Sequence, residues 1–332
     1  MKKSALFISL AFAVTSCYEP YIKDFEHSGV YVAYQYDLRS LVVGEGMTFD
    51  LGCVLGGVTE NDRDRHVSIM LDDELVTGSL QAYGGTTAYD GLMNLPSQSY
   101  VSTAMINAKL KTIHLLPREY FTLSEKENLV IREGTHTAVT SFHVDSLAIL
   151  SDPNIGKSPY YAFGYRIIGA DADIVLPNKC FGIIAIQLQN MFFGDWYHGG
   201  KSVTYDADGN VIEGSETVYP TTIPANGNSY SVYALATNDA YSCTTKFFHN
   251  VSGKMTIGMD GTNVTISGTK GSGKKLQTIV DRGCSWNGAA KIQDRKIFLN
   301  YEYNNTDGTI TVVTDTLSFR ARTRDGVNEW QQ

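Results

Sequence analysis

Met255-Thr256-Ile257 and Val264-Thr265-Ile266 stand on either side of Asp260-Gly261-Thr262-Asn263, and this stretch decides the class of fold. The side chains of a β-strand point alternately to its two faces, so apolar residues at every second position predict one buried face. An Asp-Gly pair between two such runs is a strong signal for a tight hairpin. Residues 255–266 therefore predict two antiparallel strands joined by a short turn.

The same alternation recurs along the chain, in Ser229–Leu235 and again in Lys296–Tyr303. Asp206–Asn210 and Thr306–Gly308 have the composition of turns. The chain contains 20 tyrosines and 31 glycines, only 19% of its residues are charged, and apolar residues rarely follow the helical period. These patterns predict an all-β protein, with a short helix expected within Ser97–Leu110.

A domain boundary is indicated near Asn190. Cys180–Leu188 is a continuous apolar run with the length of a strand. A new strand pattern then begins within Asn190–Trp196. A chain of 332 residues is long enough for about two domains. Short strands with frequent turn signals are typical of sandwiches and barrels. We therefore expect a β-sandwich over residues 18–189 and a β-barrel over residues 190–332.

The N-terminus has the order of an export signal: a basic start, an apolar stretch and then small residues before Cys17. Its apolar stretch, Ser4–Val14, is far shorter than the ~20 residues that cross a bilayer as a helix. The segment Val14-Thr15-Ser16-Cys17 predicts a lipoprotein signal over residues 1–17, with lipid attached to Cys17. An ordinary secretory signal with an incidental cysteine is the alternative.

Charge and cysteine usage exclude several classes of function. The formal net charge is −8, and loss of Lys2 and Lys3 with the signal makes the remainder more negative, which argues against nucleic-acid binding. The other four cysteines form no Cys-x-x-Cys pair, so a metal or redox motif is not supported. Disulfides are permitted outside the cytoplasm, but buried free thiols are the favoured interpretation of Cys53, Cys180, Cys243 and Cys284.

Catalytic and cofactor motifs are incomplete. Gly268–Lys275 nearly matches a phosphate-binding loop, but Lys275 stands where a magnesium-binding hydroxyl is required. Asp206, Asp208 and Asn210 imitate the start of a calcium loop whose later positions are wrong, so a plain turn is favoured over weak calcium binding. No His-Glu-x-x-His or Gly-x-Ser-x-Gly motif occurs. We expect no enzyme, no cofactor and no metal.

Several segments resemble surface lipoproteins of the Bacteroidetes. The first domain carries that family's charged segment, its Leu-Pro segment, its strand-turn and its Tyr-rich strand, here Asn61–Asp64, Leu116–Leu123, Leu129–Gly134 and Tyr161–Ile167. The end of the chain, Asp315–Arg322 followed by Asp325–Trp330, resembles that of the C-terminal partner domain. The resemblance implies an immunoglobulin-like first domain, found also ahead of chitinase-like endoglycosidases whose catalytic signature is absent here, and an outer-membrane location at the cell surface.

The second domain also resembles lipocalin-like barrels. Such barrels begin with Gly-x-Trp, as in Gly194-Asp195-Trp196, and stack an arginine of the last strand on that tryptophan. The resemblance implies that Trp196 and Arg320 plug one end of the barrel through a cation–π contact.

Glycan binding is the leading functional hypothesis. Sugars stack on aromatic rings and need amide or carboxylate partners, and turn-rich loops supply both in Trp286-Asn287 and in Asp239 with Tyr241. A core position is the alternative for Trp286. In the family context the protein would capture glycans for an outer-membrane uptake complex. The alternatives are a structural or adhesin-like lipoprotein that binds a protein partner, and a lipocalin-like carrier of a small ligand.

Overall fold

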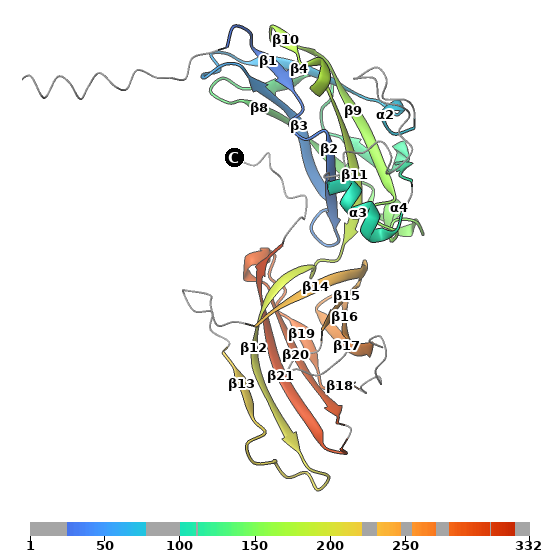
Figure 1. The fold of residues 1–332 in the computed structure, drawn as a ribbon, viewed down its shortest axis with the longest axis vertical. Helices are drawn as coiled ribbons and strands as arrows, with labels where there is room; N and C mark the ends of the chain where they lie inside the picture. Colours follow the sequence, from blue (N-terminus) through green and yellow to red (C-terminus); the bar gives the residue numbers. More distant parts are fainter. Residues whose placement is uncertain are drawn as a thin grey trace, which may run out of the picture.

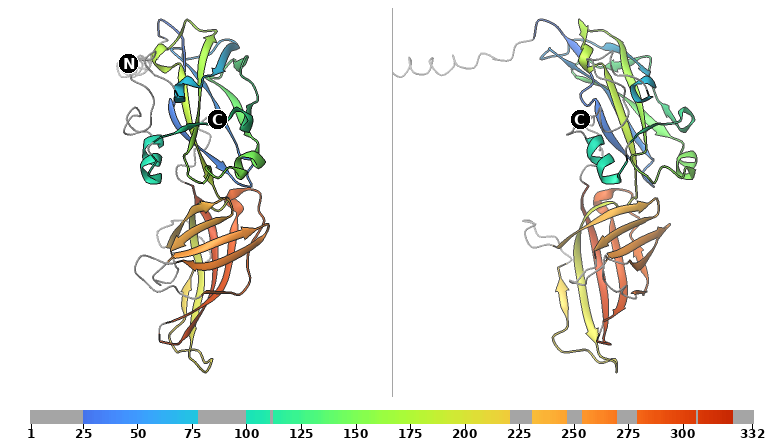
Figure 2. Two further views of the ribbon diagram at one scale, coloured as in Figure 1. Left: turned by 90° about the vertical axis from the view of Figure 1, so that its right-hand side faces the viewer. Right: turned by 45° about the vertical axis from the view of Figure 1, so that its right-hand side comes forward.

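The structure, a computed structural model, describes residues 25–77, 100–110, 112–220, 231–246, 254–269, 279–305 and 307–322. The predictions made for Cys17, for residues 270–275 and for Asp325–Trp330 lie outside these residues. The described chain forms two β-modules placed end to end along the long axis of the molecule (Figures 1 and 2). The predicted all-β, two-domain fold is confirmed.

The first module contains two sheets that pack face to face. One sheet has the strand order β10 (Ile174–Val175), β1 (Gly29–Tyr31), β3 (Thr48–Gly56), β8 (Thr137–Val144) and β6 (Phe121–Leu123). The other has the order β2 (Tyr36–Val42), β11 (Phe181–Gln189), β9 (Tyr161–Ala170), β4 (Arg65–Leu71) and β7 (Leu129–Ile131), with β5 (His114–Leu115) beside β9. Most neighbours are antiparallel, but β2 pairs with β11, β1 with β10 and β5 with β9 in parallel.

Aromatic rings from both sheets meet in the core of this sandwich. The rings of Phe142 and Phe163 stack with centroids 5.0 Å apart, and Phe49 and Phe121 extend the same stack. The outer face of the second sheet is covered by α2 (Glu74–Thr77) and α3 (Tyr100–Ala108), so β11 is buried on both faces along most of its length. This double burial explains why β11 reads as a continuous apolar run. Helix α3 lies within the range predicted for a helix.

Short helical segments connect the remaining strands of the sandwich. Asp145 caps α4 (Ser146–Ser151) by accepting hydrogen bonds from the backbone amides of Leu147 and Ala148. Two 3₁₀ turns, η3 (Arg118–Tyr120) and η4 (Pro177–Lys179), precede β6 and β11. Among the described residues no helix has both the length and the apolar character needed to cross a membrane.

The second module is a closed barrel of eight antiparallel strands. The strands follow one another as β12 (Gly194–Tyr205), β14 (Ser231–Asp239), β15 (Ser242–Lys246), β16 (Lys254–Asp260), β17 (Asn263–Thr269), β19 (Cys284–Trp286), β20 (Lys296–Asn304) and β21 (Ile310–Ala321). β21 then pairs with β12 from Tyr205↔Ile310 to Asp195↔Ala321, which closes the barrel. Two short strands, β13 (Thr217–Tyr219) and β18 (Ile279–Asp281), pair with β12 and β20.

The hairpin predicted from residues 255–266 is confirmed. β16 and β17 pair from Lys254↔Thr269 to Asp260↔Asn263, which leaves Gly261 and Thr262 as the turn. Gly261 has φ +60°, a conformation that glycine adopts without the steric cost of a Cβ atom. This turn lies at the end of the barrel that faces the sandwich.

The chain passes from the sandwich to the barrel within four residues, because β11 ends at Gln189 and β12 begins at Gly194. The side chain of Asn190 is fully buried at this joint. Its Nδ2 donates to the carbonyl of Ala240, 2.9 Å away, and its Oδ1 accepts from the amide of Phe192 at the same distance. Ala240 itself packs with the core of the sandwich, so the β14–β15 turn belongs to both modules.

The four described cysteines are all buried free thiols. Cys53 and Cys243 are fully buried, and Cys180 and Cys284 nearly so. Burial raises the pKa of the Cys53, Cys243 and Cys284 thiols to about 12. These side chains therefore act as small apolar residues of the two cores.

Candidate functional site

A pocket of about 440 Å³ lies between the two modules. The sandwich contributes Gly44 and Glu45 from the β2–β3 turn, and the joint contributes Met191. The barrel contributes the loop between β19 and β20, which includes the 3₁₀ turn η5 (Ile292–Asp294). Its lining side is formed by Trp286, Gly288, Ala289, Ala290, Ile292 and Arg295. Glycine and alanines at successive positions keep this wall open.

Glu45 joins the modules across the floor of the pocket. Its carboxylate accepts hydrogen bonds from Arg295 Nη1 at 2.5 Å and from Arg322 Nη1 and Nη2 at 2.8 and 2.9 Å. The guanidinium groups are almost fully buried, with 3% and 6% of the side chain exposed, while Glu45 is 25% exposed. Both arginines also donate to the carbonyl of Met191, so charge and backbone bonds together fix their positions.

The charges of this cluster compensate one another only in part. Burial by itself would raise the pKa of Glu45, but the hydrogen bonds and charges of Arg322 and Arg295 outweigh it and hold that pKa below its ordinary value. Glu45 is therefore ionised at neutral pH. Two guanidinium groups and one carboxylate leave a net positive charge beside the pocket.

Trp286, the aromatic residue that the sequence suggested for sugar binding, lines this pocket and is half-buried. Its indole Nε1 donates to the carbonyl of Gly261 in the β16–β17 turn, at 2.9 Å. Its ring meets the ring of Phe192 edge to face, with centroids 5.7 Å apart. The indole is thus held on two sides by the barrel end while part of it remains accessible from the pocket.

The side chain of Asn287 bonds to the backbone of its own loop and does not line the pocket. Its Nδ2 donates to the carbonyl of Asp294 at 2.8 Å, and its Oδ1 accepts from the amide of Lys296 at 3.0 Å. The amide thus closes the loop that carries the pocket wall. Asn287 supports the site through the loop, and Trp286 is the residue of the pair that lines the pocket.

Asp239 and Tyr241 lie at the same end of the barrel but on another turn, between β14 and β15. Asp239 accepts from the amide of Tyr241 at 2.8 Å and from the Ser242 hydroxyl at 2.9 Å, so its carboxylate holds the turn. The Tyr241 side chain is 60% exposed. Neither residue is among those that line the interdomain pocket.

The predicted contact between Trp196 and Arg320 at the end of the barrel is wrong, because Arg320 does not meet Trp196. Trp196 is fully buried in the barrel core and donates from Nε1 to the carbonyl of Phe192. The side chain that meets it from the last strand is Phe319, edge to face at 5.5 Å. Arg320 instead lies over the ring of Tyr197 and 3.8 Å from Asp195, with 45% of its side chain exposed. A register shift between Asp195 and Trp196 makes Arg320 the extra residue of a bulge.

A second polar cluster lies inside the barrel, and no local sequence pattern predicts it. His198 Nε2 is 2.9 Å from Asp315 Oδ1, and both side chains are completely buried. The hydroxyl of Tyr301 donates to the other Asp315 oxygen at 3.4 Å, and burial followed by the charge of Asp315 raises the Tyr301 pKa. The ring of His198 also meets that of Tyr233 edge to face. These contacts hold the barrel wall together from within.

The calcium-like segment forms a plain turn. Asp206 Oδ1 accepts from the backbone amides of Asp208 and Asn210, at 3.0 and 2.8 Å, which is how an aspartate stabilises a turn. The residues on either side of this turn, Tyr205 and Val211, form an isolated β-bridge. In the described part of the chain no three His, Cys, Asp or Glu side chains gather in a way that could hold a metal ion.

The fold and this site define a class of protein: a β-sandwich joined through a tight interface to a closed eight-stranded barrel, with a pocket at the interface. Among solved structures, a protein of unknown function from Bacteroides ovatus is similar to this chain, with a TM-score of 0.55 and 16% sequence identity. The similarity covers 91% of this chain and 96% of that one. At this identity the likeness shows the fold alone, and it agrees at that level with the resemblance to proteins of the Bacteroidetes.

A multidomain protein including DUF1735, also from Bacteroides ovatus, aligns with 88% of this chain and 94% of its own at 11% identity, and its TM-score of 0.35 is too low to support an argument. No protein-family model matches the sequence, and no curated protein matches it.

Proposed function

We propose that the chain is a non-catalytic surface lipoprotein that binds glycans in the interdomain pocket. Lipid on Cys17 holds it in the outer membrane, and a neighbouring uptake complex receives the captured glycan. The observation that carries the proposal is the position of Trp286, which lines a pocket of about 440 Å³ beside a buried charge cluster. Pockets between domains that combine an aromatic wall with a few fixed polar groups are typical ligand sites.

Each wall of the pocket suits a different part of a sugar. The indole of Trp286 offers an apolar face for the C–H groups of a pyranose ring. Glu45 supplies a carboxylate that is partly exposed and firmly held, so it can accept hydrogen bonds from hydroxyl groups without reorganising. The net positive charge further favours sugars that carry a carboxylate or sulfate.

The same groups argue for binding rather than hydrolysis. Glycoside hydrolysis needs two carboxylates about 5–10 Å apart, one of them kept protonated as the acid. Of the described residues that line the pocket, Glu45 is the only carboxylate. Its pKa is lowered by the two arginines, so it is poorly suited to donate a proton at neutral pH.

The decisive experiment is a glycan screen of residues 18–332, made without lipid, with acidic and neutral polysaccharides and mucin glycans. Trp286→Ala should weaken binding about tenfold or more, because the stacking surface is lost. Tyr241→Ala is the matched control, since it removes an exposed aromatic ring from a neighbouring turn outside the pocket. Equal binding by wild type and Trp286→Ala would show that the glycan binds at another site. The absence of binding to any glycan would refute the proposal.

A protein-binding role is the second candidate, favoured by the far end of the barrel. Val211, Ile212 and Val218 are 57%, 37% and 65% exposed there, next to or on the short strand β13. Exposed apolar side chains beside a strand edge suit a partner that adds a strand of its own. Co-purification with an outer-membrane partner that Val218→Lys abolishes, together with indifference to glycans, would select this role. The carrier alternative finds no such support, because the described interior side chains of the barrel pack against one another.

A further inference from the structure

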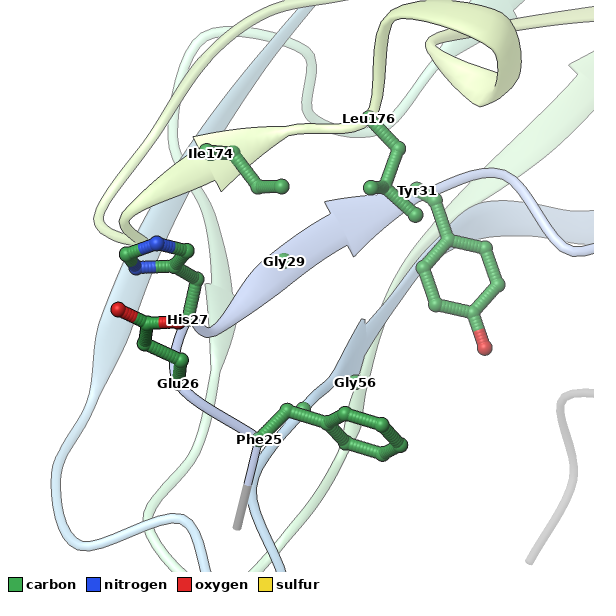
Figure 3. A pocket seen from close by; sticks show the side chains of 9 residues that line it. Phe25, Glu26, His27, Gly29, Tyr31, Gly56, Ile174 and Leu176 are labelled. Atoms are coloured by element: carbon green, nitrogen blue, oxygen red, sulfur yellow. The ribbon is translucent and has the colours of Figure 1, made fainter.

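A shallow groove of about 490 Å³ lies on the sandwich where the described chain begins (Figure 3). Its floor is made by Gly29, Gly56 and Gly57, whose lack of side chains leaves the space open. A Cβ at Gly56 would come within 3.1 Å of the Tyr31 ring, and one at Gly29 within 3.5 Å of Ile174. A side chain at either glycine would therefore occupy part of the groove between Tyr31 and Ile174.

The walls of the groove are apolar and unusually exposed. Phe25 has 80% of its surface exposed and Ile174 has 41%, and both lie at the rim with Tyr31 and Leu176 (Figure 3). Backbone bonds hold these residues in place: the amide of Phe25 donates to Gly57 O at 2.8 Å, and that of Ile174 donates to the carbonyl of Ser28. The backbone of Phe25 is held in this way while its side chain stays exposed, as is expected where another apolar phase covers that side chain.

The position of the groove points to what that phase is. Strands β1 and β10, which carry its walls, lie at the end of the sandwich away from the barrel (Figure 1). Seven residues separate Cys17 from Phe25, and the eight residue-to-residue steps span at most about 29 Å when fully extended. A lipid on Cys17 therefore keeps the groove within that distance of the bilayer, whatever path the connecting residues take.

We propose that this groove is a membrane-docking surface, on which Phe25 and Ile174 rest against the boundary between headgroups and acyl chains of the bilayer that holds Cys17. The inference rests on the lipid anchoring in the proposed function. The lipid on Cys17 supplies the affinity for the membrane. Because the short segment from Cys17 to Phe25 keeps the groove close to the bilayer, a small apolar contact is enough to orient the molecule.

The charges at the groove restrict the lipid. Glu26 and His27 belong to its lining, and the carboxylate of Asp173 lies beside it, where it accepts two bonds from Ser28. Bonds from Ser28 lower the pKa of Asp173, so its charge is present at neutral pH. The ammonium of Lys179 lies over the Tyr31 ring, 5.3 Å from its centroid, and offsets one of these two carboxylates. The charge that remains near the rim is negative, so a zwitterionic surface fits better than an anionic one.

The test places a tryptophan at the groove in the full, lipidated chain. Phe25→Trp and, separately, Ile174→Trp are incorporated into phosphatidylcholine vesicles with or without brominated acyl chains, which quench indole by contact. The extra fluorescence relative to wild type should fall at least twofold with brominated lipid. Val218→Trp, at an exposed apolar position on β13 of the barrel, should show no change.

The outcomes separate the groove from the anchor. If wild-type protein does not enter the vesicles and Cys17→Ala behaves identically, the anchoring proposal fails. If the protein is vesicle-bound but bromine quenches neither groove tryptophan, or quenches Val218→Trp equally, the docking surface is refuted. Protection of the groove tryptophans from aqueous iodide without quenching by bromine would also refute it, because protein rather than lipid then covers the groove.

Discussion

The carboxylate of Glu45 receives three hydrogen bonds from two arginines of the other module, although Arg322 lies 277 residues away in the sequence. Its pKa is lower in the folded protein than the ordinary value of 4.5. A group of this kind stabilises the fold fully above its unfolded pKa, and the contribution disappears as the pH falls through the folded pKa. The joint between the modules should therefore be weakened by acid.

Glu45→Gln should lower the free energy of unfolding by about 2 kcal/mol at pH 7, because charge-assisted hydrogen bonds become neutral ones. The difference from wild type should narrow as the pH falls below the ordinary value of 4.5 and through the lowered pKa of the native carboxylate, which then also becomes protonated. Urea unfolding followed by tryptophan fluorescence at pH 7 and pH 3.5 measures both values. A difference that stays constant with pH would contradict this assignment.

Glu302→Gln is a control of identical chemistry. Glu302 pairs with Arg282 on the barrel surface at 2.7 Å, but the arginine is 53% exposed. An ion pair in water contributes little, so this variant should unfold close to wild type at both pH values.

Arg320 shows where reasoning from single residues fails. Alternation along β21 puts Leu317 and Phe319 in the barrel core and so places Arg320 on the outer face, whereas the resemblance to Gly-x-Trp barrels predicted that Arg320 would meet Trp196. The local sequence predicts Trp286 as a candidate, and Trp286 does line the pocket. The sequence does not predict that Glu45, Arg295 and Arg322 belong to the site, because only the folded chain brings them together.

At the scale of elements, the pairing of β12 with β21 closes the barrel and depends on Gly200. This glycine has φ +142°, and a Cβ placed on it would lie 2.2 Å from the carbonyl oxygen of Thr314. The close approach also places the buried Asp315 beside β12, where it meets His198. A side chain at this position must therefore push the two strands apart.

Gly200→Ala should destabilise the barrel by about 2 kcal/mol or more, since it combines overpacking with a strained backbone. Thermal unfolding followed by near-ultraviolet circular dichroism measures the loss. Gly209→Ala is the matched control: Gly209 also has a positive φ, +84°, but its added Cβ would meet no atom within 4 Å. If both variants lose the same stability, backbone strain rather than the contact with Thr314 is responsible.

Elements with strong local patterns were the ones that sequence could predict. The Asp-Gly hairpin, the alternation in β20 and the apolar run of β11 each depend on neighbouring residues only. The parallel pairing of β2 with β11 joins Tyr36 to Ile183, and no local signal specifies a partner so far along the chain. Strands of three residues such as β13 and β18 are likewise too short to show a period.

At the scale of the whole molecule, the placement of the modules rests on few contacts, among which Asn190 is central. Asn190→Ala removes the partners of the Ala240 carbonyl and the Phe192 amide in a buried joint. We expect a loss of about 2 kcal/mol and a looser angle between modules. Small-angle scattering should then show a broader distribution of dimensions than wild type.

Asn238→Ala serves as the comparison, because Asn238 is an exposed asparagine near the same end of β14 and its bonds to Ser242 and Thr244 stay within the barrel. Its scattering should match that of wild type. If Asn190→Ala also scatters like wild type, the Glu45 cluster alone is sufficient to fix the two modules.

The burial of the four thiols gives the molecule a practical property. At neutral pH these groups stay protonated and out of reach of maleimides and other alkylating reagents, since ionised and accessible sulfur is what reacts. A cysteine introduced on the surface of each module would therefore be modified selectively among the described residues. Donor and acceptor dyes attached in this way would report the angle between sandwich and barrel in the native protein, with none of the four described cysteines to be removed first.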